Sequence, residues 1–263
     1  MFEEHAKNLL VLGTVAAAAC ASVPAGGSDE NPRAVQPERP TVATHAGTVA
    51  RGYAELESGV ERDRLDDGTH ALSVPSVLKL GLAPRTQLSL TLPLYRAPGV
   101  PFGAGDAAVG VKWRFVENHP LLQDVAVLPQ VKLATGGVRG TGTTDASLLL
   151  IDSHTFGSVA LDVNVGVTRR SGDGTRAPRS ATLWTVSSGL PVRGPLGWAL
   201  EVYGYPGTSG PAGAPPIVAL LAGPTLAVRP TLALDVGFIT PLAGPQPHAL
   251  YAGLVTNFGR VWR

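Results

Sequence analysis

The side chains able to do chemistry in this sequence are few and widely separated. His70, His154 and His248 have none of the close spacings, such as i and i+4, by which paired histidines hold a metal. No Gly-x-Ser-x-Gly sequence marks an activated serine, and Ser153 and His154 are adjacent in an alternating stretch, so they point to opposite faces. Residues 135–145 are rich in Gly and Thr but lack the Gly-Lys-Ser/Thr of a phosphate loop. We therefore predict no catalytic residues, no metal site and no cofactor.

Acidic and basic residues instead recur on the polar side of alternating stretches. Opposite charges facing a narrow enclosed interior would be expected to pair there, because buried charges need partners. Two interpretations stay open for each residue: a solute-binding position in a constricted pore, or a member of a structural ion-pair network. The candidates are Glu57, Lys79, Asp106, Lys112, Arg114, Lys132, Asp162, Glu201 and Asp235.

The elements that position these side chains show a period of two. In residues 86–95, Leu88, Leu90 and Leu92 share one face, while Gln87 and Ser89 share the other. About twelve such stretches follow one another, most of them close to the ~10 residues that a tilted strand needs to cross a bilayer. They cover residues 54–61, 72–82, 86–95, 108–115, 125–133, 149–153, 158–167, 183–190, 198–204, 218–228, 232–238 and 250–258. The pattern predicts an all-β fold.

The connections between these stretches alternate between long and short. The long ones are residues 63–69, 96–105, 135–145, 169–179, 206–215 and 241–247. The short ones are residues 83–85, 117–123, 154–157, 191–197 and 229–231. Antiparallel up-and-down transmembrane β-barrels have this asymmetry, with short periplasmic turns and longer external loops. An even number of strands places both chain ends in the periplasm.

Alternation alone does not separate a membrane barrel from a soluble β-sandwich, so side-chain chemistry must decide. The polar faces are rich in Gly, Ala, Ser and Thr, and only 16% of all residues are charged. Lys112 and Arg114 oppose Val111 and Trp113, and a basic residue facing lipid would cost about 2–4 kcal/mol at the bilayer midplane. The aliphatic face should therefore contact lipid. Aromatic residues near strand ends are expected to form interfacial girdles: Tyr95, Trp113, Phe115, Trp198, Tyr205 and Phe258.

The N-terminal part has a different composition. Residues 9–21 form an apolar run too short to span a bilayer, and Ala19-Cys20-Ala21 fits a signal peptidase site, so we predict a signal peptide at 1–21. Lipoprotein processing at Cys20 is the alternative. Residues 22–46, rich in Pro and Gly, are predicted to be a flexible periplasmic segment preceding a barrel at 47–263. The net charge of +1 gives no indication of nucleic-acid binding.

Several segments resemble a known family. The sequence from Tyr251 to Phe258 is similar to the C-terminal signal by which outer-membrane barrels engage the barrel-assembly machinery. The most specific segment runs from Gly105 to Arg114, and Leu56 to Gly59, Val131 to Gly136 and Glu201 to Gly204 add to it. Together they resemble the outer-membrane putative transporters of the MetA-pathway of phenol degradation family.

The resemblance implies an outer-membrane location and no established catalytic residues. It also implies a passive channel or transporter, with membrane lipids and a small hydrophobic or aromatic solute as partners. Two other functions stay open: a lipase-like outer-membrane hydrolase, because a lipase class also uses a twelve-strand barrel, and a structural barrel without transport.

Overall fold

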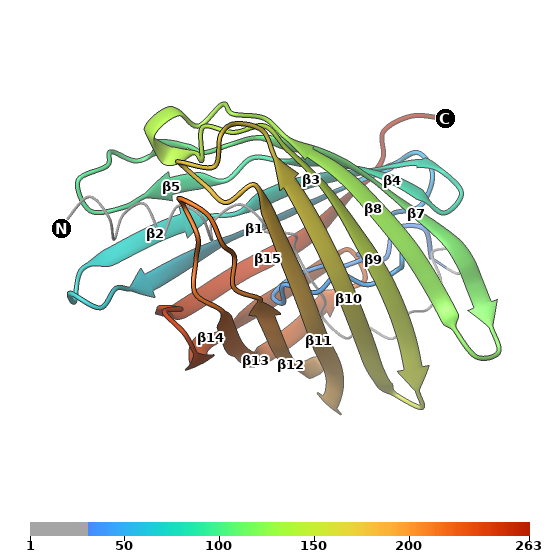
Figure 1. Cartoon of the computed structure of the whole chain (residues 1–263). Helices are drawn as coiled ribbons and strands as arrows, with labels where there is room; N and C mark the ends of the chain where they lie inside the picture. Colours follow the sequence, from blue (N-terminus) through green and yellow to red (C-terminus); the bar gives the residue numbers. More distant parts are fainter. Residues whose placement is uncertain (1–30) are drawn as a thin grey trace.

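The computed structural model describes residues 31–263, and nearly all regular structure in this range is β (Figure 1). The strands are β1 (Tyr53–Arg64), β2 (His70–Val74), β3 (Ser76–Ala83), β4 (Thr86–Thr91), β5 (Leu94–Arg96), β6 (Gly103–Ala104), β7 (Ala108–His119), β8 (Gln123–Lys132), β9 (Asp145–Phe156), β10 (Val159–Arg170), β11 (Ser180–Arg193), β12 (Leu196–Tyr205), β13 (Ile217–Arg229), β14 (Leu232–Ala243) and β15 (His248–Arg260). A single 3-10 turn, Gly137–Arg139, lies in the loop between β8 and β9. No helix within residues 31–263 is long and apolar enough to span a membrane.

These segments form a closed barrel of twelve antiparallel strands. Neighbouring strands pair in sequence order, and β15 pairs with β1 from Tyr53↔Arg260 to Arg64↔His248. The labelled segments outnumber the barrel strands because three barrel strands are interrupted: β2 and β3 at Pro75, β4 and β5 at Pro93, and β6 and β7 at residues 105–107. Proline has no N–H to donate to a ladder, which explains the first two breaks. The predicted fold and strand number are confirmed.

The two ends of the barrel differ. β3–β4, β7–β8, β9–β10, β11–β12 and β13–β14 are joined by turns of two or three residues. The connections at the opposite end are longer, up to the twelve residues 133–144. Short turns face the periplasm in bacterial barrels, so we call their end the periplasmic end and the other the external end. β1 begins and β15 ends at the periplasmic end, as predicted.

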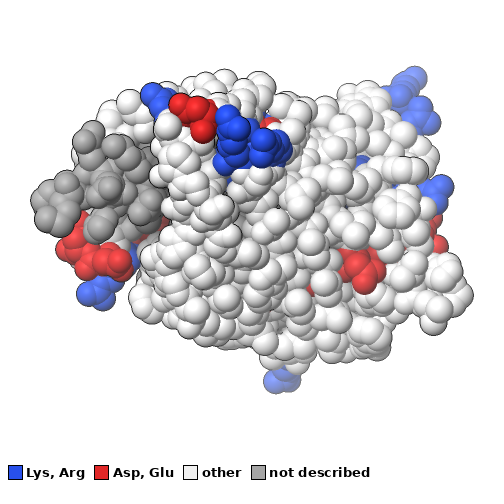
Figure 2. Space-filling model, in the orientation of Figure 1, with Lys and Arg blue, Asp and Glu red and all other residues white. Residues whose placement is uncertain are grey.

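The outer face is apolar and exposed. In β7, burial alternates residue by residue, with Lys112 fully buried and Trp113 53% exposed. Val165 and Val167 on β10 are about half exposed, and most of the face visible in Figure 2 carries neither acidic nor basic side chains. A continuous aliphatic belt of this extent would be unfavourable in water, but it matches the hydrocarbon core of a membrane. The barrel is therefore a membrane-spanning one; the charged side chains in the middle of its strands are directed inward, and outward ones such as Arg62 and Arg169 lie near strand ends.

The predicted aromatic girdle is only partly present. Trp113, Phe115, Trp198 and Phe258 are exposed on the outer face, toward the periplasmic end. Tyr205 instead packs with Tyr203 inside the barrel, and Tyr95 pairs with Ser73, which in turn opposes the inward Glu61. The prediction for the two tyrosines was wrong because nearness to a strand end does not override alternation.

Residues 34–50 lie inside the barrel, where the blue segment of Figure 1 is enclosed by strands. Ala43 and Ala46 are completely buried and Thr44 is 1% exposed. A flexible periplasmic segment was expected over 22–46, and for residues 34–46 the structure contradicts it. The Pro-rich segment forms neither strand nor helix, as its composition indicates. Side chains of the barrel wall bind its backbone N–H groups in place of a ladder. The predicted signal peptide and residues 22–30 lie outside the described range.

Candidate functional site: the lumen and the segment that fills it

The segment of residues 34–50, called the lumen segment below, forms a loop that enters and leaves through the periplasmic end. At its start, the Val35 N–H donates to the Pro230 carbonyl in the β13–β14 turn. At its end, Gly52 N–H donates to the Gly81 carbonyl beside the β3–β4 turn. Between these points the loop contacts side chains from β1, β3, β4, β7, β9, β10, β12 and β14, which come from all sides of the barrel. It therefore crosses the whole lumen.

Side chains of the wall bind the backbone N–H groups of this loop. Glu201 on β12 accepts hydrogen bonds from the N–H groups of Val42 and Ala43, both at 2.6 Å. Asn164 on β10 binds Thr44 on both sides, accepting from its N–H at 2.7 Å and donating to its carbonyl at 2.9 Å. Four further N–H groups are bound singly: Gln36 by Glu55, Glu38 by Glu57, Ala46 by Ser153 and Val49 by Gln87. An irregular buried backbone is thus satisfied without a β-ladder.

Two fully buried lysines hold the centre of the lumen. Lys79 Nζ lies 2.6 Å from Glu55 Oε1 and 2.6 Å from Glu57 Oε1, and donates to the Gln36 carbonyl. Lys112 pairs with Glu38 of the lumen segment and donates to the His45 carbonyl at 3.0 Å. The Lys79 ammonium group is therefore shared between the wall and the segment, whereas both partners of Lys112 belong to the segment. Removing the segment would leave wall carboxylates and ammonium groups facing an open space that water can fill.

A slot in the wall receives Arg39 of the lumen segment. Its guanidinium lies 3.3 Å from Asp235 of β14. Gly253 on β15 pairs with Asp235 on one side and Gly59 on the other, and a Cβ at either glycine would overlap the guanidinium. Glycine in a strand interior weakens the strand, but it allows another group to approach closely. The row Asp235–Gly253–Gly59 therefore forms an arginine site across three adjacent strands.

The external end has a separate charge network. Lys132 Nζ lies 2.9 Å from Asp106 and 3.2 Å from Asp145, and Arg170 Nε lies 3.3 Å from Asp145. Asp106 also accepts hydrogen bonds from the N–H groups of Gly136 and Thr141, so it fixes the 133–144 loop to the barrel. Burial by itself would raise the pKa of Asp106, but these N–H groups and Lys132 outweigh it, and the pKa lies below its ordinary value. This network binds a loop and does not contact the lumen segment.

One wall of the lumen is apolar and aromatic. Tyr203 and Tyr205 meet edge to face with ring centroids 6.1 Å apart, and Val42 of the lumen segment packs against their cluster. The other members, from β13, β14 and β15, are Ala219, Leu221, Ile239, Ala249 and Tyr251. We call this group the tyrosine wall. It contrasts with the charged surface around Lys79, which it adjoins where β15 pairs with β1.

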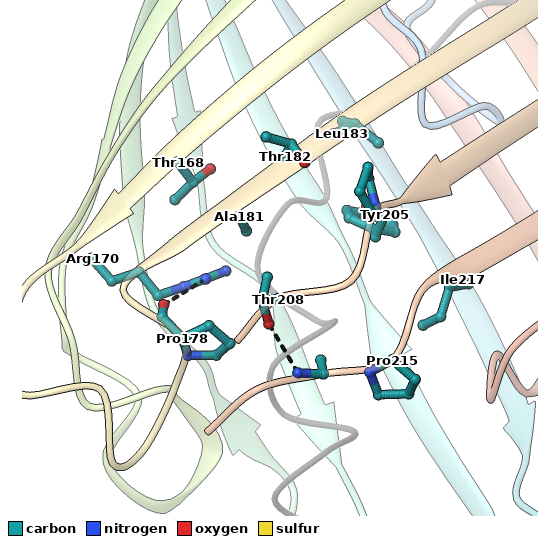
Figure 3. A pocket seen from close by; sticks show the side chains of 12 residues that line it. Thr168, Arg170, Pro178, Ala181, Thr182, Leu183, Tyr205, Thr208, Pro215 and Ile217 are labelled. Carbon is teal, nitrogen blue, oxygen red and sulfur yellow. Dashed lines mark hydrogen bonds between the residues drawn. The ribbon is translucent and has the colours of Figure 1, made fainter. Parts of the chain in front are cut away.

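A small pocket adjoins the tyrosine wall at the external end (Figure 3). It lies among the ends of β10, β11, β12 and β13 and is lined by Thr168, Arg170, Leu183, Tyr205, Thr208 and Ile217, among others. Arg170 is held at its edge by donating to the Pro178 carbonyl. The cavity volume is about 40 Å³. That is well below the ~150 Å³ of a protein cavity known to bind benzene, so an aromatic solute needs further space from the lumen.

All nine residues predicted to face the interior are buried, but the structure divides them into groups. Glu57, Lys79, Lys112, Glu201 and Asp235 contact the lumen segment directly. Asp162 accepts from the Ser153 hydroxyl, which in turn binds the segment. Asp106 and Lys132 belong to the external network, and Arg114 pairs with Glu117 and Asp124 at the periplasmic β7–β8 hairpin.

Sequence reasoning missed Glu38, Arg39 and the whole lumen segment. A signal was present in the balance of inward charges. The wall groups that contact the segment are the carboxylates Glu55, Glu57, Glu201 and Asp235, against the ammonium groups of Lys79 and Lys112. Buried carboxylates in excess need N–H donors from elsewhere. The residues just before the first strand are the part of the described chain that supplies them.

The other chemistry considered from the sequence is not assembled in residues 31–263. Ser153 donates to Asp162, while the His154 ring lies 3.0 Å from Asp152, so the two neighbours have different partners. No group of three or more His, Cys, Asp and Glu side chains within the described residues is arranged to hold a metal ion.

The fold of this chain is similar to that of solved outer-membrane barrels. No protein-family model matches the chain, and no curated protein sequence matches it. The barrel is similar to the crystal structure of the COG4313 outer membrane channel from Pseudomonas putida F1, with a TM-score of 0.63, 12% identity, and coverage of 80% of this chain and 97% of that one. It is also similar to the NanC porin structure, with a TM-score of 0.55, 10% identity, and coverage of 77% and 98%. The fold is that of outer-membrane β-barrels.

Proposed function

We propose that this outer-membrane barrel is a passive channel for small hydrophobic or aromatic compounds. The observation that carries the proposal is the tyrosine wall, an aromatic and aliphatic surface inside a lumen whose centre is charged around Lys79 and Lys112. Tyr203 and Tyr251 offer ring faces and edges against which an aromatic solute can pack, with a gain beyond simple area burial. The sequence resemblance to the MetA-pathway putative transporters supports the same solute class. The fold shared with a COG4313 outer membrane channel is consistent with passage through the lumen.

The proposal is tested by swelling of vesicles that contain the full chain. Two neutral solutes of similar size are compared, 4-hydroxybenzamide and xylitol, with protein-free vesicles as the baseline. We expect faster entry of the aromatic solute, and a selective loss of that advantage in Leu221→Ser, which makes the tyrosine wall polar. Ser187→Ala is the matched control, because Ser187 is equally buried in the lumen but lies outside the tyrosine wall.

Equal entry of both solutes, or no entry above the baseline, would refute the proposed solute class. Tight vesicles together with a correctly folded barrel would favour the structural role. Turnover of a chromogenic ester that is lost in Ser153→Ala would favour the hydrolase.

A further inference from the structure

We propose that the lumen is a binding site for a folded-back peptide without regular secondary structure, and that the lumen segment is a ligand of this site that exchanges while the barrel stays closed. The proposal goes beyond the solute channel and does not depend on the solute class. It rests on how the segment is held, on what holds the barrel, and on the shape of the Arg39 slot.

The wall recognises the segment mainly through its backbone. Seven N–H groups between Gln36 and Val49 donate to side chains of the wall, and Lys79 and Lys112 donate to carbonyls of the segment. Pro37 and Pro40 lack an N–H, so they place no unsatisfied donor between these contacts. A site whose side chains bind backbone N–H and C=O groups can accept a peptide that forms neither strand nor helix.

The barrel does not need the segment for its own pairing. Each barrel strand finds both neighbours in the sheet, and β1 pairs directly with β15. The segment contributes no strand, and its backbone bonds to the barrel backbone lie at its two ends, at Val35 and next to Gly52. On its departure, Lys79, Glu55, Glu57 and Glu201 would regain water, which offsets part of the lost hydrogen bonding. Release is therefore feasible without opening the wall.

Three side chains fix the register of the peptide. Arg39 enters the slot above Gly59 and Gly253, Glu38 pairs with Lys112, and Val42 packs against the tyrosine wall. The preferred ligand is thus a folded-back peptide with adjacent Glu and Arg and an aliphatic residue three positions after the Arg. The pore left by its release is acidic, since the contacting wall groups are four carboxylates against two lysines. It should prefer cations.

The test separates the segment from the barrel after folding. A protease recognition sequence is inserted between Ala50 and Arg51, beside the exposed Arg51, and the folded protein is cut and dialysed in detergent. In planar bilayers with KCl, we expect the cut protein to conduct with a cation-selective reversal potential, while the uncut protein stays nearly closed. A synthetic peptide of residues 34–50 should close the pore again.

The matched control is the same peptide with Arg39 and Val42 replaced by alanine. It should need at least roughly tenfold more peptide for half-closure, because it keeps the backbone contacts but loses two of the three register contacts. The proposal is overturned if the cut pore stays closed, if neither peptide reduces its conductance, or if both close it equally well. A second variant lacking residues 34–50 must still show heat-modifiable migration, and its failure to form a closed barrel would also overturn the proposal. None of these readouts uses an aromatic solute, so they stand apart from the test of the channel's solute class.

Discussion

Glu201 offers a direct measure of how strongly the wall holds the lumen segment. Its two carboxylate oxygens each accept one N–H, from Val42 and from Ala43, at 2.6 Å, and the side chain is 1% exposed. Hydrogen bonds to a charged acceptor contribute about 1.5–3 kcal/mol each. Glu201→Ala loses both, but it also removes a buried charge whose desolvation opposes binding. We therefore expect a net loss of about 3 kcal/mol in the docking of the segment, taking the lower end of the range for each bond.

This loss converts to a change in gating. Since each 1.4 kcal/mol is a factor of ten, the ratio of open to closed time should rise roughly 100-fold in Glu201→Ala. Glu201→Gln keeps one neutral carbonyl oxygen that accepts one of the two N–H groups, so a rise of about tenfold is expected. Single-channel recording in KCl measures both ratios on the intact chain.

Ser187→Ala is the control for this series. Ser187 lies directly opposite Glu201 in the β11–β12 pair, is 2% exposed, and its hydroxyl makes no hydrogen bond. Its open-to-closed ratio should equal that of the unmodified chain, with unchanged heat-modifiable migration in all variants. An Ala variant within twofold of the unmodified chain, or a Gln variant more open than Ala, would refute the reasoning.

Three further predictions concern the other contacts. Lys79→Met leaves Glu55 and Glu57 buried without their shared cation, so the heat-modifiable transition should move to a lower temperature, by the equivalent of about 3–5 kcal/mol of barrel stability. Adding Glu55→Gln and Glu57→Gln should restore most of the lost stability, and an unchanged transition in Lys79→Met would contradict the expectation. Gly253→Val fills the slot beneath the Arg39 guanidinium, so the open-to-closed time ratio in single-channel recordings should rise, whereas Leu254→Val on the lipid face should leave that ratio unchanged. The pKa of Asp106 is lowered on folding, so its contribution to holding the 133–144 loop is complete at neutral pH and is lost as the pH falls through that lowered pKa. Amide exchange at Gly136 and Thr141 should accelerate in that pH range. In Asp106→Asn, exchange of these two amides should be fast at every pH.

The barrel was predictable because lipid makes alternation informative. In β7, every second residue must avoid the hydrocarbon. Lys112 and Trp113 are neighbours and therefore point to opposite faces, so the lysine identifies the lumen face and the tryptophan the lipid face. The interruptions at Pro75 and Pro93 were not predicted, because the leucine alternation continues through both prolines. The signal in the sequence for both interruptions is the missing N–H of proline, which removes a hydrogen bond from the ladder.

The inward direction of the nine charged residues was predictable, but their partners were not. Alternation states which face a residue occupies and nothing about what fills the space in front of it. Glu201 and Asp235 bind Val42, Ala43 and Arg39 from nearly 160 to 200 positions away in sequence. The lumen segment has no periodicity of its own because side chains, and not a ladder, satisfy its backbone. A composition rule for disorder therefore could not recognise it.

The arrangement of the lumen segment also determines the order of assembly. The segment precedes β1 in the chain, yet its contacts come from strands as late as β14, and its slot uses Gly253 of β15. No complete receptor for it exists until the last strand has met the first. Docking is therefore completed no earlier than closure of the wall, and because both ends of the loop are at the periplasmic rim, the segment occupies the lumen as a folded-back hairpin. The seal of the lumen is thus among the last features of the barrel to be completed.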